Sequence, residues 1–180
     1  MRIAILGHSG SGKSTLARKI GELYDLPVLH LDTLQFESNW VERDKDEARL
    51  MCRAFMDFND SWVIDGNYTW QFQQERLDNA DLIVFMLFNR FNCLYRAFKR
   101  YKNYKGKSRP DMTDGCDEKL DREFITWILF SSRTAEKEEK RAFLKQKYAS
   151  KMRIIKNQRQ LDRFIAEAES LSLSGQLPKP

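Results

Sequence analysis

The chain has 180 residues, of which 42% are hydrophobic and 32% charged, a balance typical of a globular domain. A chain of this length buries roughly 70% of its unfolded surface, so it needs neither disulfides nor a structural metal to form a core. No apolar run approaches the roughly 20 residues that cross a bilayer, and the apolar start at residues 1–6 is too short for a signal peptide. We therefore expect a single domain over residues 1–180, located in the cytoplasm.

The positive charge of the chain is unevenly distributed. The net charge is +5, and between Arg90 and Arg109 there are eight lysines and arginines and no acidic residue. A basic segment of this kind permits contact with DNA or another polyanion, although a mild overall positive charge does not identify the partner. DNA contact through residues 90–109 therefore remains open.

Cysteines and histidines are few and scattered. The chain has three cysteines and two histidines, with no CxxC pair and no metal-ligand spacing. They are Cys52, Cys93, Cys116, His8 and His30. We expect free thiols and no zinc site.

Apolar runs alternate with amphipathic segments along the chain. In order, we expect strand 2–6, helix 13–24, strand 27–31, helix 43–58, strand 61–64, strand 81–88, helix 91–104, helices 117–131 and 135–149, strand 151–155 and helix 161–171. Gly106, Pro110 and Gly115 indicate a loop over residues 105–116. Because strands alternate with helices of crossover length, the pattern predicts an α/β three-layer sandwich with a parallel sheet.

Residues 7–15 (GHSGSGKST) match the P-loop pattern G-x-x-x-x-G-K-[ST]. A chance Gly/Ser-rich loop would match too, but this segment directly follows an expected strand and opens an expected helix. Backbone N–H groups and the helix N-terminus would cradle the phosphates of Mg²⁺-ATP. Lys13 would reach the β- and γ-phosphates, Ser14 would bind Mg²⁺ and Thr15 would contact the α-phosphate. The residues expected to hold the nucleotide are Gly7, Ser9, Gly10, Ser11, Gly12, Lys13, Ser14 and Thr15.

Two expected strands end in an aspartate. Asp65 follows an apolar run typical of the strand that supplies a Mg²⁺-side carboxylate, so we expect it near the metal. Asp32 would then face the phosphate acceptor, as a binding group or general base. An aspartate just past a strand can also be a turn former or helix cap, but ligands bind at the carboxyl ends of strands in open α/β sheets.

Arg96 and Arg100 share one face of the expected helix 91–104. We expect them to clamp the nucleotide and neutralise charge on the transferring phosphoryl group, with Arg133 and Arg141 reaching the same site. A lid-like insertion is expected at about 105–133. The same basic helix is also compatible with a solvated face, or with a surface that contacts nucleic-acid phosphates.

Aromatic residues are expected mainly in the core, namely Trp62, Trp70, Trp127 and the Phe-rich runs of residues 85–98. Residues 66–68 and Trp40 are candidates for an acceptor pocket, but spacing alone does not establish this.

The motifs described so far are similar to those of small kinases of the adenylate kinase and shikimate kinase type. More closely, the chain resembles the bacterial DNA topology modulation protein family, through GHSGSGKSTLA (7–17), HLD (30–32), NW (39–40), WVIDGNY (62–68), AD (80–81) and RPDMTDGCDEKLD (109–121). The resemblance implies ATP binding and an adenylate kinase-like P-loop fold with a five-stranded sheet in the order 2-3-1-4-5. It does not imply a defined reaction. Where adenylate kinases have Asp-Gly-Phe-Pro-Arg, this chain has DGNYT (65–69), which lacks the arginine that holds a nucleoside monophosphate.

These features predict an ATP-dependent phosphotransferase with an unknown acceptor. Two alternatives remain open: a nucleotide-dependent regulator that binds DNA or protein, and an ATPase in which water replaces the acceptor.

Overall fold

A computed structural model describes all residues from Met1 to Pro180. Five parallel strands form one sheet in the order β2-β5-β1-β6-β7, which is the predicted order 2-3-1-4-5. The strands are β1 (Arg2–Gly7), β2 (Val28–His30), β5 (Trp62–Asp65), β6 (Leu82–Met86) and β7 (Met152–Ile155). All residues of β5 and β6 are buried, which explains why these strands are almost wholly apolar in sequence.

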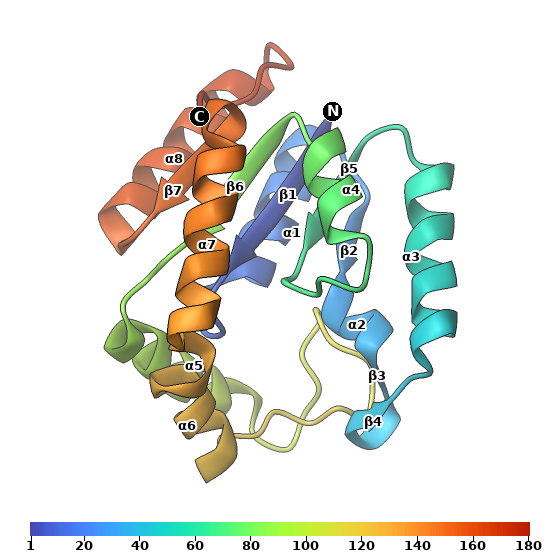
Figure 1. Cartoon of the computed structure of the whole chain (residues 1–180), viewed down its shortest axis with the longest axis vertical. Coiled ribbons are helices and arrows are strands. Elements are labelled where there is room, and N and C mark those ends of the chain that lie inside the picture. The colour runs from blue at the N-terminus through green and yellow to red at the C-terminus, as the bar shows by residue number, and fades with distance from the viewer.

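Helices cover both faces of the sheet, so the predicted three-layer sandwich is confirmed (Figure 1). One apolar core lies between the sheet and the helices α1 (Lys13–Tyr24), α5 (Arg90–Tyr104), α6 (Arg122–Leu129) and α8 (Gln158–Ser172). The other lies beneath α2 (Leu31–Gln35), α3 (Lys45–Phe58), α4 (Gln73–Asn79) and α7 (Ala135–Lys147). No helix is long and apolar enough to span a membrane.

Side-chain caps fix where several helices begin. Asp44 accepts hydrogen bonds from the backbone of the first turn of α3, and Asn157 caps α8 in the same way. Asp121 caps α6 through the backbone N–H of Phe124. The helix expected over residues 117–131 is therefore wrong at its start, because Asp121 begins the helix and residues 117–120 lie outside it.

A small unit at the carboxyl ends of the strands was not predicted. Strands β3 (Phe36–Glu37) and β4 (Val41–Glu42) pair antiparallel around a 3₁₀ turn over Ser38–Trp40, and they are too short to give a periodic sequence signal. The helix α4 was also missed. Figure 1 shows the β3–β4 unit at the end of the molecule opposite both termini.

Residues 113–117 dock directly on the β3–β4 unit. Thr113 Oγ1 donates to the Phe36 carbonyl over 2.6 Å, and Ser38 Oγ donates to the Asp114 carbonyl over 2.8 Å. The loop expected over residues 105–116 thus packs against residues 33–40, and Figure 1 shows it running from the end of α5 to that unit. Its role as a lid that opens stays a prediction.

Aromatic residues only partly follow the expectation of burial. Trp62 is 1% exposed and lies in the core, as predicted. Trp127 is 41% exposed, and Phe91, Tyr95 and Phe98 on α5 are 72%, 65% and 48% exposed. The expected burial is confirmed for Phe85 and Phe88 but is wrong for Trp127 on α6 and for Phe91 and Phe98 on α5. The apolar stripe of α5 that meets the sheet consists of smaller residues, such as Cys93 and Ala97.

Candidate active site

The P-loop lies between β1 and α1 and is shaped by glycines with positive φ. Gly10 and Gly12 have φ of +77° and +95°, and a Cβ atom at Gly10 would lie 2.4 Å from the Cys93 carbonyl oxygen. Ser11 N–H donates to the His8 carbonyl over 3.1 Å, which closes the turn. The N–H groups of Gly10, Gly12 and Lys13 donate to no backbone carbonyl. This geometry matches a phosphate cradle at a helix N-terminus.

The structure brings the two predicted Mg²⁺ groups together. Ser14 Oγ donates to Asp65 Oδ2 over 3.1 Å, because β5 lies beside β1 and ends next to the start of α1. The Asp65 side chain is only 5% exposed, and His30 Nδ1 contacts its other carboxylate oxygen. Sequence reasoning missed His30, although its position at the end of the strand beside β5 marks it. Ser14 and Asp65 fit a Mg²⁺ ion, since hydroxyl and carboxylate oxygens are its usual protein ligands.

Asp32 lies near this pair but not where the sequence suggested. Strand β2 confirms the expected strand 27–31 to within one residue at each end, but it ends at His30, and Asp32 lies two residues further on, in the first turn of α2. The Tyr68 hydroxyl donates to Asp32 Oδ1 over 2.8 Å. Burial, together with the negative charge of Asp32, raises the pKa of Tyr68 well above its usual value. Tyr68 therefore remains a hydrogen-bond donor, and Asp32 Oδ2 is left for another partner.

Asn67 joins the loop after β5 to the P-loop. Its Nδ2 donates to the Gly7 carbonyl over 2.7 Å, and its Oδ1 accepts from the Gly7 N–H over 3.1 Å. Arg76, which is fully buried, donates to the carbonyls of Tyr68 and Gln71 over 3.0 and 2.8 Å. Burial lowers the pKa of Arg76 to about 10, so the guanidinium remains charged at neutral pH. These contacts, which the sequence did not reveal, hold residues 67–71 in place.

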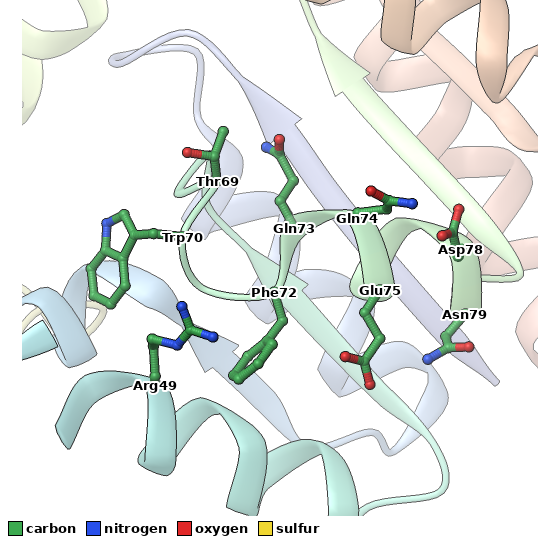
Figure 2. Close-up of a pocket in the computed structure, with 9 residues that line it drawn as sticks. All are labelled: Arg49, Thr69, Trp70, Phe72, Gln73, Gln74, Glu75, Asp78 and Asn79. Carbon is green, nitrogen blue, oxygen red and sulfur yellow. The ribbon is translucent and has the colours of Figure 1, made fainter. Parts of the chain in front are cut away.

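A pocket of about 550 Å³ lies on the outer side of the same loop, between α3 and α4 (Figure 2). Arg53 binds both carboxylate oxygens of Glu75 over 2.6 Å, and its guanidinium lies 4.3 Å from the Phe72 ring centroid. Arg49 lies 4.8 Å from the same ring, and Figure 2 shows it next to Trp70. The contacts around this pocket support the loop from outside.

The two predicted clamp arginines have different surroundings. Arg96 Nη1 donates to the Ser11 carbonyl over 2.9 Å, and the guanidinium lies 4.3 Å from the Phe88 ring centroid. Burial lowers the pKa of Arg96. Its other Nη contacts Gln158 Oε1. Arg96 is therefore placed directly on the P-loop, whereas Arg100 lies one turn further along α5 and has a carboxylate partner.

That partner belongs to a buried ion cluster of two arginines and two carboxylates. Arg100 Nε donates to Glu118 Oε1 over 2.7 Å, and Arg109 Nε lies 2.7 Å from Glu118 Oε2 in an ionic contact without good hydrogen-bond angles. Arg109 also donates to Asp111 over 2.9 Å. The side chains of Glu118 and Arg109 are 2% and 8% exposed. The cluster fastens residues 109–118 to α5 and balances the charge of both arginines.

Arg133 and Arg141 were expected to reach the nucleotide site, and that role stays a prediction. Arg133 Nη2 donates to the Phe88 carbonyl over 2.9 Å, and Arg141 is held by Glu138 and by the Ser132 carbonyl. The positive charges of these two arginines act on the imidazole of His8, which belongs to the P-loop. Burial and then the charges of Arg133, Arg141 and Lys13 lower the pKa of His8 to about 3. The P-loop is thus surrounded by cations that favour a bound polyanion.

A cavity of about 1690 Å³ extends from the P-loop to Asp32, Tyr68 and Trp40. At one end it is lined by the P-loop and by Trp127, whose Nε1 donates to Ser9 Oγ over 3.2 Å. At the other end it is lined by Asp32, Tyr68 and Trp40. One cavity therefore joins the nucleotide site to the predicted acceptor site.

Comparisons with known proteins identify the fold. Neither the models of known protein families nor the sequences of curated proteins match this chain. Solved structures do. TT1252 from Thermus thermophilus is 16% identical, covers 99% of this chain and 98% of its own, and has a TM-score of 0.56. The shikimate kinase from Bacteroides thetaiotaomicron is 18% identical, with coverages of 95% and 97% and a TM-score of 0.52.

The shikimate kinase from Acinetobacter baumannii, solved in complex with shikimate, is 17% identical, with coverages of 98% and 95% and a TM-score of 0.51. At these identities the likeness shows the fold alone. Membership of the DNA topology modulation family stays a prediction. The chain has the α/β fold of shikimate kinase-like P-loop kinases, with a five-stranded parallel sheet.

Proposed function

We propose that this protein is an ATP-dependent phosphotransferase that transfers the γ-phosphoryl group of Mg²⁺-ATP to a hydroxyl group of a small molecule. One observation carries the proposal: the Ser14–Asp65 pair at the P-loop and the carboxylate of Asp32 line or adjoin one continuous cavity. Asp32 lies at the acceptor end of this cavity, where a carboxylate can act as the general base for an acceptor hydroxyl. The kinase fold of its structural neighbours is consistent with this function.

Each residue has a defined part in the proposed reaction. Backbone N–H groups of the P-loop and Lys13 bind the phosphates, and Ser14 with Asp65 holds Mg²⁺, which neutralises phosphate charge. Asp32 Oδ2 accepts the proton of the acceptor hydroxyl, while Tyr68 fixes the other oxygen. Arg96, held at the P-loop, stabilises charge on the phosphoryl group in transit. Arg133 and Arg141 add positive potential.

The test measures ADP release from Mg²⁺-ATP with a broad panel of hydroxyl-bearing compounds, for the wild type and for Lys13→Ala. Lys19→Ala is the matched control, since Lys19 lies on the same helix and pairs with Glu169 at the surface. We expect an acceptor to stimulate ADP release, and Lys13→Ala to abolish both stimulation and ATP binding. If Lys13→Ala retained full ATP affinity, the nucleotide site would be assigned wrongly. If no compound stimulated ADP release by the wild type, the proposed phosphotransferase function would be refuted.

A second candidate function is a nucleotide-dependent regulator that contacts DNA through the basic residues 90–109. The exposed aromatic side chains Phe91, Tyr95 and Phe98 on α5, with the Lys102 ammonium 5.9 Å from the Phe98 ring centroid, favour it. Duplex DNA binding should then weaken steeply with salt, and Lys99→Ala with Lys102→Ala should flatten that slope. Absence of any salt-dependent binding would exclude this role.

A further inference from the structure

The acceptor end of the cavity has aromatic walls. Phe36 and Trp40 lie edge to face with ring centroids 5.3 Å apart, and Tyr68 and Trp70 lie edge to face at 6.1 Å. All four residues line the cavity, as does Asp32, whose Oδ1 accepts from the Tyr68 hydroxyl. Aromatic side chains of this kind bind flat rings by stacking or edge contacts.

Trp40 is held in this place in an unfavourable backbone conformation. Asn39 and Trp40 have φ of +62° and +63°, the left-handed region, which is rare for a bulky side chain. The docked segment keeps them there: Asn39 N–H donates to the Gly115 carbonyl over 3.1 Å, and Trp40 Nε1 donates to the Asp117 carbonyl over 2.9 Å. Strain of this kind persists only when neighbouring structure enforces it, and it is concentrated at ligand sites.

Two arginines at this end, Arg100 and Arg109, have their charges already balanced. Arg100 and Arg109 are paired with Glu118, and Arg109 also with Asp111, so neither presents a free guanidinium to an incoming phosphate. Phosphate groups in proteins are typically held by such free guanidinium forks. The unpaired cation beside Trp40 is Lys119, a single ammonium 5.7 Å from the ring centroid. Arg18 and Arg122 also line the cavity and form no ion pair; Arg18 shares the face of α1 with Ser14 at the metal end, and Arg122 begins α6.

We infer that the acceptor is a compound with a flat ring and a free hydroxyl group but no phosphate, for which a nucleoside is the simplest probe. This inference rests on the proposed phosphotransferase function. The ring lies against Trp40 and Phe36, and the hydroxyl faces Asp32 Oδ2. The hydroxyl oxygen forms a bond to the γ-phosphorus, and the bond from that phosphorus to the β–γ bridging oxygen breaks. ADP leaves with the electron pair, and the hydroxyl proton passes to Asp32 and then to water.

The first experiment compares ADP release with adenosine, thymidine, AMP, TMP, and the non-aromatic hydroxy acid shikimate. We expect the nucleosides to raise the rate at least tenfold above the rate without acceptor, and AMP and TMP to give no such increase. If the monophosphates or shikimate were the better acceptors, the inference would be overturned while the phosphotransferase function stood. If no compound of the broad panel raised the rate, that function would fail as well.

The second experiment uses Trp40→Gly, Trp40→Phe and the control Phe58→Leu, which changes an exposed aromatic side chain at the end of α3, outside the cavity. Glycine tolerates the positive φ at position 40, so Trp40→Gly removes the ring and relieves the strain together. We expect Trp40→Gly to raise the Kd of the nucleoside, measured by calorimetry without ATP, at least tenfold. Trp40→Phe should raise it less than threefold, and Phe58→Leu not at all. An unchanged Kd in Trp40→Gly would refute the role of Trp40.

Discussion

The buried ion cluster offers a sharp test of how residues 109–118 are attached to the rest of the protein. The Glu118 side chain is 2% exposed and contacts both Arg100 and Arg109 at 2.7 Å. Replacing it with glutamine keeps the shape but removes the negative charge. The cluster, which contains two guanidinium groups and two carboxylates, then carries an uncompensated positive charge in a buried place.

The size of the effect follows from burial. Breaking a buried ion pair by removing one partner typically costs about 3–5 kcal/mol, because the remaining charge is left without compensation. Since the glutamine carbonyl still accepts one hydrogen bond from Arg100, we expect Glu118→Gln to lower the free energy of unfolding by about 3 kcal/mol. For a domain of this size, 1 kcal/mol shifts Tm by about 2–4 °C, so Tm should fall by about 6–12 °C.

The assay is equilibrium urea unfolding at neutral pH, with thermal unfolding as the second measurement. Glu136→Gln is the control, because Glu136 forms an ion pair with Lys140 in which both side chains are at least 66% exposed, and its loss should leave the midpoint unchanged. If Glu118→Gln lowered the free energy of unfolding by less than about 1 kcal/mol, the argument would be refuted. So small a loss would mean that water solvates the two arginines once the charge of Glu118 is gone.

Three further predictions follow from single contacts. Asp65→Asn should abolish most of the Mg²⁺ dependence of ATP binding, measured by calorimetry with and without Mg²⁺; an unchanged dependence would remove Asp65 from the metal site. Asn67→Ala breaks two hydrogen bonds to Gly7 and should lower the free energy of unfolding in urea by about 1–3 kcal/mol, whereas Gln73→Ala, which breaks one exposed bond, should cost less than half as much. The pKa of His8 falls from 6.5 to about 3 on folding, so the folded protein keeps the imidazole neutral. The free energy of unfolding is therefore unaffected by this group above pH 6.5 and decreases as the pH falls from 6.5 towards 3. Between pH 7 and pH 5 this costs about 2 kcal/mol, and His8→Asn should lose that much less stability than the wild type over the same interval.

The sequence by itself determined the fold class and the location of the P-loop. These depend on local signals: apolar runs buried on both faces, as in β5 and β6, and glycines at Gly10 and Gly12 whose positive φ the phosphate cradle requires. The order of the strands was expected from the resemblance to the DNA topology modulation protein family rather than from periodicity, and the structure confirmed it.

Only the tertiary structure decided how the second half of the site is built. Asp32 was expected at the end of a strand and lies in a helix, and Arg100 was expected to clamp the nucleotide and is paired with Glu118. Trp40 faces the cavity because residues 115 and 117 hold it there, from 75 or more positions away in the chain. Contacts over such separations leave no periodic trace in the sequence. The P-loop could therefore be located from neighbouring residues, whereas the sequence only suggested Asp32, Trp40 and residues 66–68 for the acceptor site, and the fold showed that they line one cavity.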